Sequence, residues 1–188
     1  MEKKIFIKNC IASILFFIAT NISLFSNPFG GGLGTETDPF RIYTKEHIEE
    51  LADSVNNSPT TPNNWSKGKY FILMNDITDS VRTVIGYNNR AFQGNFDGNN
   101  KKIILGLDYY NTNPVALFGL AVKCELKNII VSGYVIGMVH IGGIAGRSEN
   151  NVVISNCINL GFIKGHYAVG GILGDVDPFF LYYIENIK

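Results

Sequence analysis

The chain contains three histidines, the side chains that most often bind zinc in proteins. A zinc peptidase needs two His one helical turn apart, with a Glu between them. His47 lies in a predicted helix together with Glu49, but no second His follows it. His140 and His166 are 26 residues apart, which does not match the repeat of 28 residues described below. We therefore predict that His140 and His166 are solvated residues at bends and that the chain holds no metal or other cofactor.

Paired carboxylates could act as general acid and base or as ligands of Ca²⁺. Glu149 and Asp177 are 28 residues apart and would stack in neighbouring coils. Both lie beside turns, where acidic residues are common because they are solvated, so we predict no functional pair. The chain has no Gly-x-Ser-x-Gly elbow, and no Cys has an evident His partner. The sequence therefore predicts a protein that is not an enzyme.

The elements that carry these residues are one helix and many short strands. Thr44 is a suitable N-cap, and apolar residues from Ile48 to Val55 recur at helical spacing, which predicts a helix over residues 44–56. Residues 69–74 are typical of a strand. From Val81 onward, short runs of apolar and aromatic residues alternate with Gly and Asn. That pattern is typical of all-β structure.

The strand region contains an internal repeat. Residues 125–137 align without gaps on residues 153–165, and residues 141–146 align on residues 169–174. Every aligned pair is 28 positions apart, which suits three short strands and their bends in one turn of a solenoid. We predict an all-β fold, a right-handed parallel β-helix of about four coils, with the helix capping its N-terminal end.

Stacked coils place equivalent residues above one another. Asn128 would lie under Asn156, and their amides would pass hydrogen bonds from coil to coil inside the solenoid, satisfying buried polar groups. Glycines allow sharp bends or close approach of the backbone. The repeated glycines of the two aligned copies are Gly142, Gly143, Gly146, Gly170, Gly171 and Gly174.

The register also predicts the state of the cysteines. Cys157 corresponds to Ile129, which is five residues along the coil from Cys124. Five residues of extended strand span roughly 16 Å, and a disulfide needs Cα atoms within about 7 Å. We therefore predict two free, buried thiols.

The charge balance argues against an anionic partner. The chain has 16 Lys and Arg and 16 Asp and Glu, so its formal net charge is zero. Binding to nucleic acid or to an anionic membrane surface requires an excess of basic residues. We predict that the chain binds no nucleic acid.

The N-terminus has the pattern of a secretory signal peptide. Lys3, Lys4 and Lys8 precede an uncharged apolar run over residues 11–19, which is too short to span a bilayer. The alternative is an uncleaved N-terminal anchor. We predict a signal peptide at residues 1–26, a lead-in with the helix and first strand at 27–80, and solenoid repeats at 81–188. The mature chain would be secreted or at the cell surface, without a membrane span.

Two segments carry a resemblance to a known family. Gly-Gly-Ile-Ala-Gly at residues 142–146 and Gly-Gly-Ile-Leu-Gly at residues 170–174 resemble the GLUG motif of bacterial surface proteins. The same repeat occurs in the accessory region of immunoglobulin-A-cleaving metallopeptidases. Ile144 and Ile172 stand where the motif has Leu. The resemblance implies a right-handed β-helix, export and an adhesin-like surface role, and it implies no reaction.

These observations together predict an exported, non-catalytic repeat protein of the cell surface, adhesin-like or a scaffold. Its ligand would be a glycan or a host protein, which the sequence does not identify. The alternative is a carbohydrate-binding or carbohydrate-cleaving β-helix module. Residues 184–186 echo residues 154–156, so another coil begins near the C-terminus. We expect the solenoid to be incomplete there and the apolar residues 179–184 to promote association.

Overall fold

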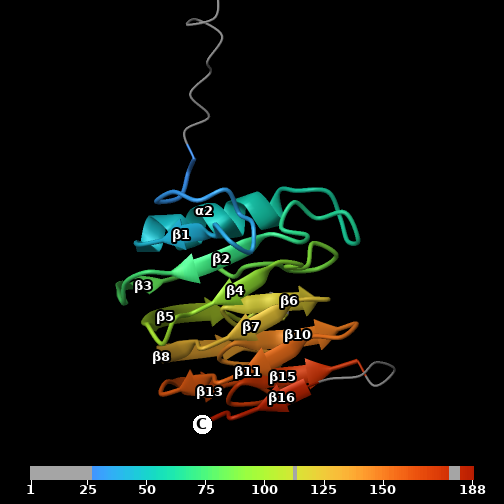
Figure 1. Ribbon diagram of the computed structural model, residues 1–188. Helices are drawn as coiled ribbons and strands as arrows, with labels where there is room; N and C mark the ends of the chain where they lie inside the picture. The colour runs from blue at the N-terminus through green and yellow to red at the C-terminus, as the bar shows by residue number, and fades with distance from the viewer. Residues whose placement is uncertain (1–26, 112–113, 178–182) are drawn as a thin grey trace, which may run out of the picture.

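The computed structural model describes residues 27–111, 114–177 and 183–188. The predicted signal peptide at residues 1–26, and all but the last residues of the apolar segment 179–184, lie outside the described residues. The described chain winds into a β-solenoid of about five turns, one more than predicted, whose coils stack from β1 at one end to β16 at the other (Figure 1).

Most strands lie on three faces of the solenoid, and all the strand pairs are parallel. Sheet A has the order β1 (Phe40–Ile42), β2 (Tyr70–Leu73), β4 (Asn95–Asp97), β7 (Glu125–Lys127), β11 (Val153–Ser155) and β16 (Tyr183–Glu185). Sheet B contains β3 (Ile77–Val81), β5 (Lys102–Tyr109), β8 (Ile130–Gly137), β12 (Ile158–Asn159) and β13 (Phe162–Lys164). Sheet C contains β6 (Phe118–Val122), β10 (Ala145–Glu149) and β15 (Leu173–Val176), and β9 (Val139–Ile141) pairs separately with β14 (Tyr167–Val169).

The strand register confirms the predicted repeat. Ile154 pairs with Leu126 in sheet A, Phe162 with Tyr134 in sheet B, and Leu173 with Ala145 in sheet C, always 28 positions apart. Residues 184–186 also occupy the same place in their coil as residues 154–156, because Ile184 in β16 pairs with Ile154 in β11. Another coil therefore begins at β16.

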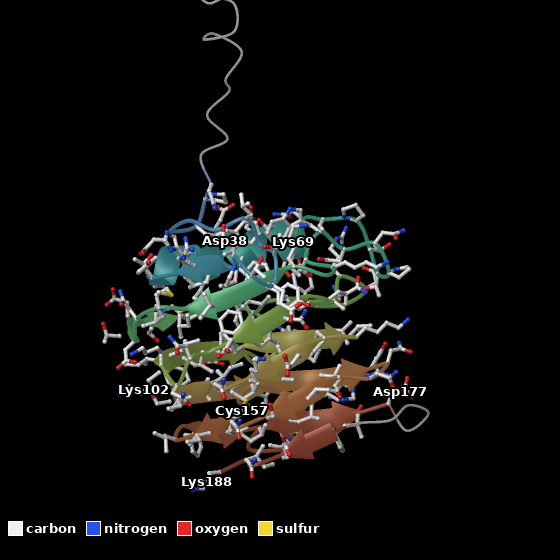
Figure 2. The ribbon with its side chains drawn as sticks, in the orientation of Figure 1. Asp38, Lys69, Lys102, Cys157, Asp177 and Lys188 are labelled. Atoms are coloured by element: carbon white, nitrogen blue, oxygen red, sulfur yellow. The ribbon has the colours of Figure 1, made fainter. Side chains whose placement is uncertain are left out.

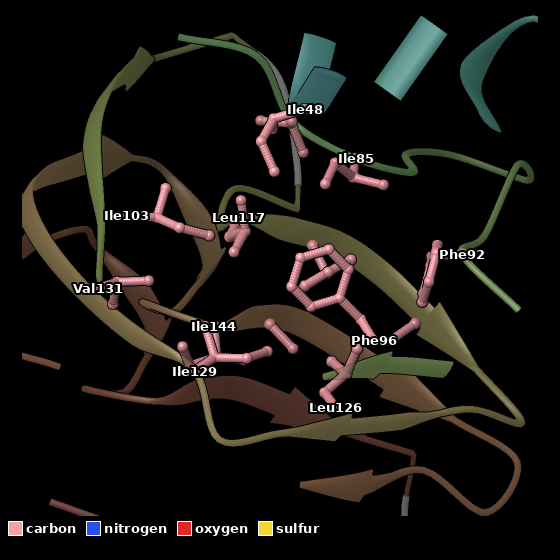
Figure 3. Close-up of a cluster of buried hydrophobic side chains, with 14 of the residues drawn as sticks. Ile48, Ile85, Phe92, Phe96, Ile103, Leu117, Leu126, Ile129, Val131 and Ile144 are labelled. Carbon is pink, nitrogen blue, oxygen red and sulfur yellow. The ribbon is translucent and has the colours of Figure 1, made fainter. Parts of the chain in front are cut away.

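Helix α2 (Lys45–Asn56) covers the N-terminal end of the stack, as predicted (Figure 1). The Oγ1 atom of Thr44 caps it by accepting a hydrogen bond from the backbone N–H of His47 at 3.4 Å. The helix buries one apolar face, and its Ile48 points toward Ile85 and Leu117, which lie in two successive coils beneath it (Figure 3). Covering the first coil in this way protects its strands from pairing with another chain.

The core is a column of side chains that point into the coils. Phe96, Leu126 and Ile154 lie one above another in sheet A and are at most 1% exposed. Phe118 extends the column from sheet C, with its ring 4.8 Å from that of Phe92 (centroid to centroid; Figure 3 shows Phe92 and Phe96). Burial of such apolar columns is the main stabilising contribution in a solenoid.

The frequent Asn residues have a backbone role that the sequence interpretation missed. Eight of the eleven non-glycine residues with positive φ in the described chain are Asn. Asn128, Asn156 and Asn186 follow β7, β11 and β16 at the same corner of successive coils, with φ of 55°, 52° and 49°. Asn tolerates this left-handed conformation better than most residues, so it allows a sharp corner without a glycine.

Both described cysteines are free and buried, as predicted, and Cys157 lies within the stack of coils (Figure 2). Ile158, the residue after Cys157, pairs with Ile130, whereas Glu125, the residue after Cys124, pairs with Val153. The two thiols therefore belong to different positions along the coil. Burial raises the pKa of Cys157 from 9.0 to about 11, and burial also raises the pKa of Cys124.

We expect both thiols to resist alkylation in the folded protein and to react fully once it is denatured. The reason is that burial excludes reagent and keeps the thiols protonated. Mass spectrometry of Cys124 and Cys157 under denaturing, non-reducing conditions tests this, and a cross-link between them would contradict the 28-residue stacking.

The raised pKa of Cys157 also gives a pH dependence. The contribution of this buried thiol to the free energy of unfolding is complete below pH 9.0 and is lost as the pH rises through about 11.

Candidate functional site

The outer face of sheet A presents polar side chains in columns. Along each strand the residues alternate, so Phe71, Phe96 and Leu126 point inward and their neighbours point outward. The register places three outward residues, Tyr70, Asn95 and Glu125, in one column. A second column contains Ile72, Asp97 and Lys127.

These two columns form the floor of a shallow hollow, which we call the sheet A hollow. Glu36 and Pro39, from the segment that precedes β1, form its rim. Its volume is about 260 Å³, slightly below the range typical of small-molecule pockets. The hollow therefore has room for a small unit of a ligand, and three neighbouring strands of sheet A together with Glu36 supply its polar groups.

The hollow carries more negative than positive charge. Lys127 Nζ lies 2.9 Å from Glu125 Oε2, and each of these side chains is 37% exposed. The hydrogen bond to Glu125 is the largest cause that raises the pKa of Lys127, while Asp97 and Glu36 add to the effect and burial opposes it. Lys127 therefore stays protonated among three carboxylates.

Hydrogen bonds from the backbone and from the next coil hold the floor in place. Asp97 Oδ1 accepts from the backbone N–H of Asn99 at 2.7 Å and from Asn128 Nδ2 at 2.9 Å. Asn95 Oδ1 accepts from the backbone N–H of Glu125 at 3.1 Å. Such supporting contacts fix side-chain positions before a ligand arrives, which lowers the entropic cost of binding.

The predicted Asn stack exists, but it lies on the outside of the coil. Asn156 Nδ2 donates to Asn128 Oδ1 at 3.3 Å, and Asn128 continues the chain of bonds to Asp97. Asn156 is exposed and Asn128 is half-buried, so the prediction of a buried ladder inside the solenoid is wrong. The reason is the left-handed backbone at this corner, which turns the chain into the next face and leaves the side chains in solvent.

Because the side chain of Asn156 is exposed, its replacement should have only a small effect on the free energy of unfolding. We expect Asn156→Ala to lower the free energy of unfolding by about 1 kcal/mol, because Ala is disfavoured at positive φ and loses a solvated hydrogen bond. Asn156→Gly should cost less, because Gly adopts this backbone freely. Urea titration of the two variants distinguishes these contributions, and an equal or larger loss for Gly would show that the amide dominates.

The predicted repeat glycines lie at sites of close backbone approach. A Cβ on Gly142 would be 2.1 Å from the carbonyl oxygen of Ala145, and one on Gly170 would be 2.0 Å from that of Leu173. Added carbon atoms would also meet backbone oxygens 2.6–2.9 Å away at three further repeat positions, Gly143, Gly146 and Gly174. Gly171 differs, because its nearest neighbour would be 4.0 Å away. Five of the six glycines thus fill places where a side chain does not fit.

The histidines and the candidate carboxylates take part in separate pairwise contacts. His140 Nδ1 is 3.0 Å from Asp175 Oδ2, and Arg147 Nε is 3.2 Å from Glu149 Oε1, although neither contact is aligned as a hydrogen bond. Elsewhere Tyr110 Oη and His166 Nε2 are 2.8 Å apart. Within residues 27–111, 114–177 and 183–188, no three His, Cys, Asp or Glu side chains converge as a metal site would require.

Glu149 and Asp177 stack at the end of sheet C, since the backbone N–H of Asp177 donates to the carbonyl of Ser148 at 3.0 Å. Glu149 is paired with Arg147, which lies two residues away on the same strand. The ion pair offers a structural role for the Glu149 carboxylate. A general acid and base pair would need both carboxylates to face a common reacting bond.

Part of the outer face of sheet B, around β8 and β13, is apolar and exposed. Phe162 pairs with Tyr134 on this face, and the two are 60% and 37% exposed, while Leu160 is 67% exposed. Exposed apolar patches often mark contact surfaces. At the last coil, a second hollow of about 380 Å³ is lined by residues 171–176, by Ile184 of β16 and by Ile187.

Comparisons with known proteins give distant similarities. No protein-family model matches the chain. The chain is 26% identical over 162 residues to halomucin of Haloquadratum walsbyi (strain DSM 16790 / HBSQ001), a match that covers 78% of this chain. The chain spans 2% of the length of halomucin. The resemblance of the repeats to the GLUG motif stays a prediction.

Among solved structures, the chain is similar to the crystal structure of a "putative immunoglobulin A1 protease" from Bacteroides ovatus. The TM-score is 0.49 and the sequence identity is 18%, over 85% of this chain and 68% of that chain. Neither this match nor the one to halomucin assigns the chain to a family. In the part of the chain that the structure describes, no helix is both long enough and apolar enough to cross a membrane.

Proposed function

We propose that this chain is an exported, non-catalytic repeat protein of the cell surface, with an adhesin-like or scaffold role. The observation that carries the proposal is the coil register, which arranges outward side chains in columns along a rigid stack. Such a surface suits binding, because it offers repeated contacts without bringing reactive groups together. The basic and apolar N-terminal segment supports export, and the similarity to halomucin is compatible with this role.

Surface labelling of a bacterial host that expresses the full chain tests this proposal. We expect antibodies against the solenoid to label intact cells or to detect the chain in the medium, and we expect a loss of mass that matches cleavage near residue 26. A matched variant, Leu15→Arg with Phe17→Arg, should remain unprocessed inside the cell, because charge disrupts the apolar run. Full-length chain that stays in the cytoplasm would contradict the proposal.

The alternative function is a carbohydrate-binding or carbohydrate-cleaving module. The sheet A hollow favours carbohydrate binding over carbohydrate cleavage, because it combines an aromatic residue with fixed polar groups. Cleavage is tested by incubating the chain with any glycan that it binds and searching for released products. Product release that depends on Glu149 or Asp177 would overturn the non-catalytic assignment.

A further inference from the structure

We propose that the sheet A hollow binds a glycan through sugar residues that are uncharged or carry an amino group. The inference rests on the proposed surface role and names the class of ligand. Concave sites with a few convergent polar groups are the usual places for small ligand units. In this chain the hollow is the place where polar columns of three strands meet a rim formed by another segment.

The polar groups of the hollow are a mixture of donors and acceptors. Lys127 has three N–H donors, of which one bonds Glu125, and Asn95 keeps its Nδ2 donors because its Oδ1 accepts from Glu125 N–H. The carboxylates of Glu36, Asp97 and Glu125 act as acceptors. Sugar hydroxyls both donate and accept, so they match such a mixed array better than a ligand with only one kind of group.

Apolar contact is available beside these groups. Tyr70 is half-buried in the first column, and Ile72 lies in the second column between Arg41 of β1 and Asp97. An aromatic ring offers a flat apolar face, which can pack against the C–H face of a sugar ring while its hydroxyl bonds to the polar edge. Tyr70 therefore provides the packing surface next to the hydrogen-bonding side chains of Asn95 and Glu125.

The charge of the hollow selects among sugars. Three carboxylates surround one lysine, so the local field repels sialic acids, uronic acids and sulfated sugars. A protonated amino group would be attracted, and an uncharged sugar would be unaffected. This is why we assign the hollow to uncharged or amino sugars.

A peptide strand is a less suitable occupant. Proteins often bind extended peptides by adding them to the free edge of a sheet. The floor of the hollow has no such edge, because β2 pairs with β1 and β4, β4 pairs with β2 and β7, and β7 pairs with β4 and β11. A ligand here must bind to side chains alone, as a glycan does.

The test uses the purified full chain on an array printed with neutral, amino, sialylated and sulfated glycans, followed by titration of the strongest hit. We expect binding to neutral or amino-bearing glycans and none to the acidic sets. The double variant Tyr70→Ala with Glu125→Gln should weaken that binding at least tenfold. Both side chains are partly exposed, so circular dichroism and thermal unfolding should show that the variant still folds.

Glu185→Gln is the matched control, because Glu185 lies in the same column as Asp97 and Lys127 but outside the hollow. It should leave glycan binding unchanged. The inference is overturned if the double variant binds as well as the wild type, if only acidic glycans bind, or if no glycan binds. It is also overturned if the only ligands are proteins that still bind after their glycans are removed. If the chain reaches the cell surface but gives one of these results, only the assignment of a glycan to the hollow is wrong. The proposed surface function is then unaffected.

Discussion

Replacing Phe118 with Ala is expected to lower the free energy of unfolding by about 3–5 kcal/mol. Phe118 is fully buried in sheet C, and its ring centroid lies 4.8 Å from that of Phe92 and 5.3 Å from that of Phe96. Truncation removes these contacts and leaves a cavity that the surrounding coils cannot fill without shifting. Urea unfolding followed by circular dichroism measures the loss as a lower midpoint with an unchanged slope.

Phe162→Ala is the matched control for that prediction. Phe162 is 60% exposed on the outer face of sheet B, so its truncation should cost less than about 1 kcal/mol. Similar losses at Phe118 and Phe162 would mean that the inward and outward faces of the coils have been assigned incorrectly. Such a result would also undermine the outward columns on which the sheet A hollow depends.

The second large effect is expected for Gly142→Ala, which should cost roughly 2–4 kcal/mol. The new Cβ would lie 2.1 Å from the carbonyl oxygen of Ala145 and 2.8 Å from that of Ile172 in the next coil. Neither obstacle is a flexible side chain, so the backbone of two coils has to move. Thermal unfolding and urea titration of the variant both measure this loss.

Gly171→Ala gives the comparison within the same motif. Its φ is not positive, and the nearest atom to an added Cβ is the Asn159 Nδ2 atom at 4.0 Å. We expect a change of less than about 0.5 kcal/mol. If Gly171→Ala is as harmful as Gly142→Ala, the glycines serve chain flexibility and not the close approach of coils.

The sequence predicted the repeat correctly because the two successive coils that begin at β7 and β11 match residue for residue. Residues 28 positions apart share the same place on sheets A, B and C, so their apolar and glycine patterns coincide in the sequence. The helix was equally predictable, since Thr44 caps it and its apolar residues face one side. Both features follow from local patterns that a single sequence contains.

The sheet A hollow could not be predicted in the same way. Tyr70 pairs with Asn95 at a spacing of 25, and Asn95 pairs with Glu125 at a spacing of 30, so no constant period relates the residues of its floor. The extra residues lie in bends such as Asn99 and Asn100, which adopt positive φ. Only the stacked strands show that Glu36, Asp97 and Lys127 belong to one site.

The Asn ladder shows why residue type and spacing do not determine burial. The spacing of Asn128 and Asn156 correctly predicts that they are neighbours, and their amides do bond. Their side chains lie outside the coil because the backbone at this corner is left-handed. Spacing reports which residues stack, but it does not report whether their side chains lie inside or outside the coil.

The most direct test of the 28-residue register is cross-linking on the exposed face of sheet B. In a Cys10→Ser background, the pair Tyr134→Cys and Phe162→Cys should form a disulfide under mild oxidation, because paired strands place their Cα atoms about 4.8 Å apart. The pair Tyr134→Cys and Lys164→Cys should not, because a shift of two residues increases the separation to roughly 8 Å. Mass spectrometry of the digested proteins distinguishes the two. A cross-link in the second pair but not in the first would contradict the register and the arrangement of every outward column built on it.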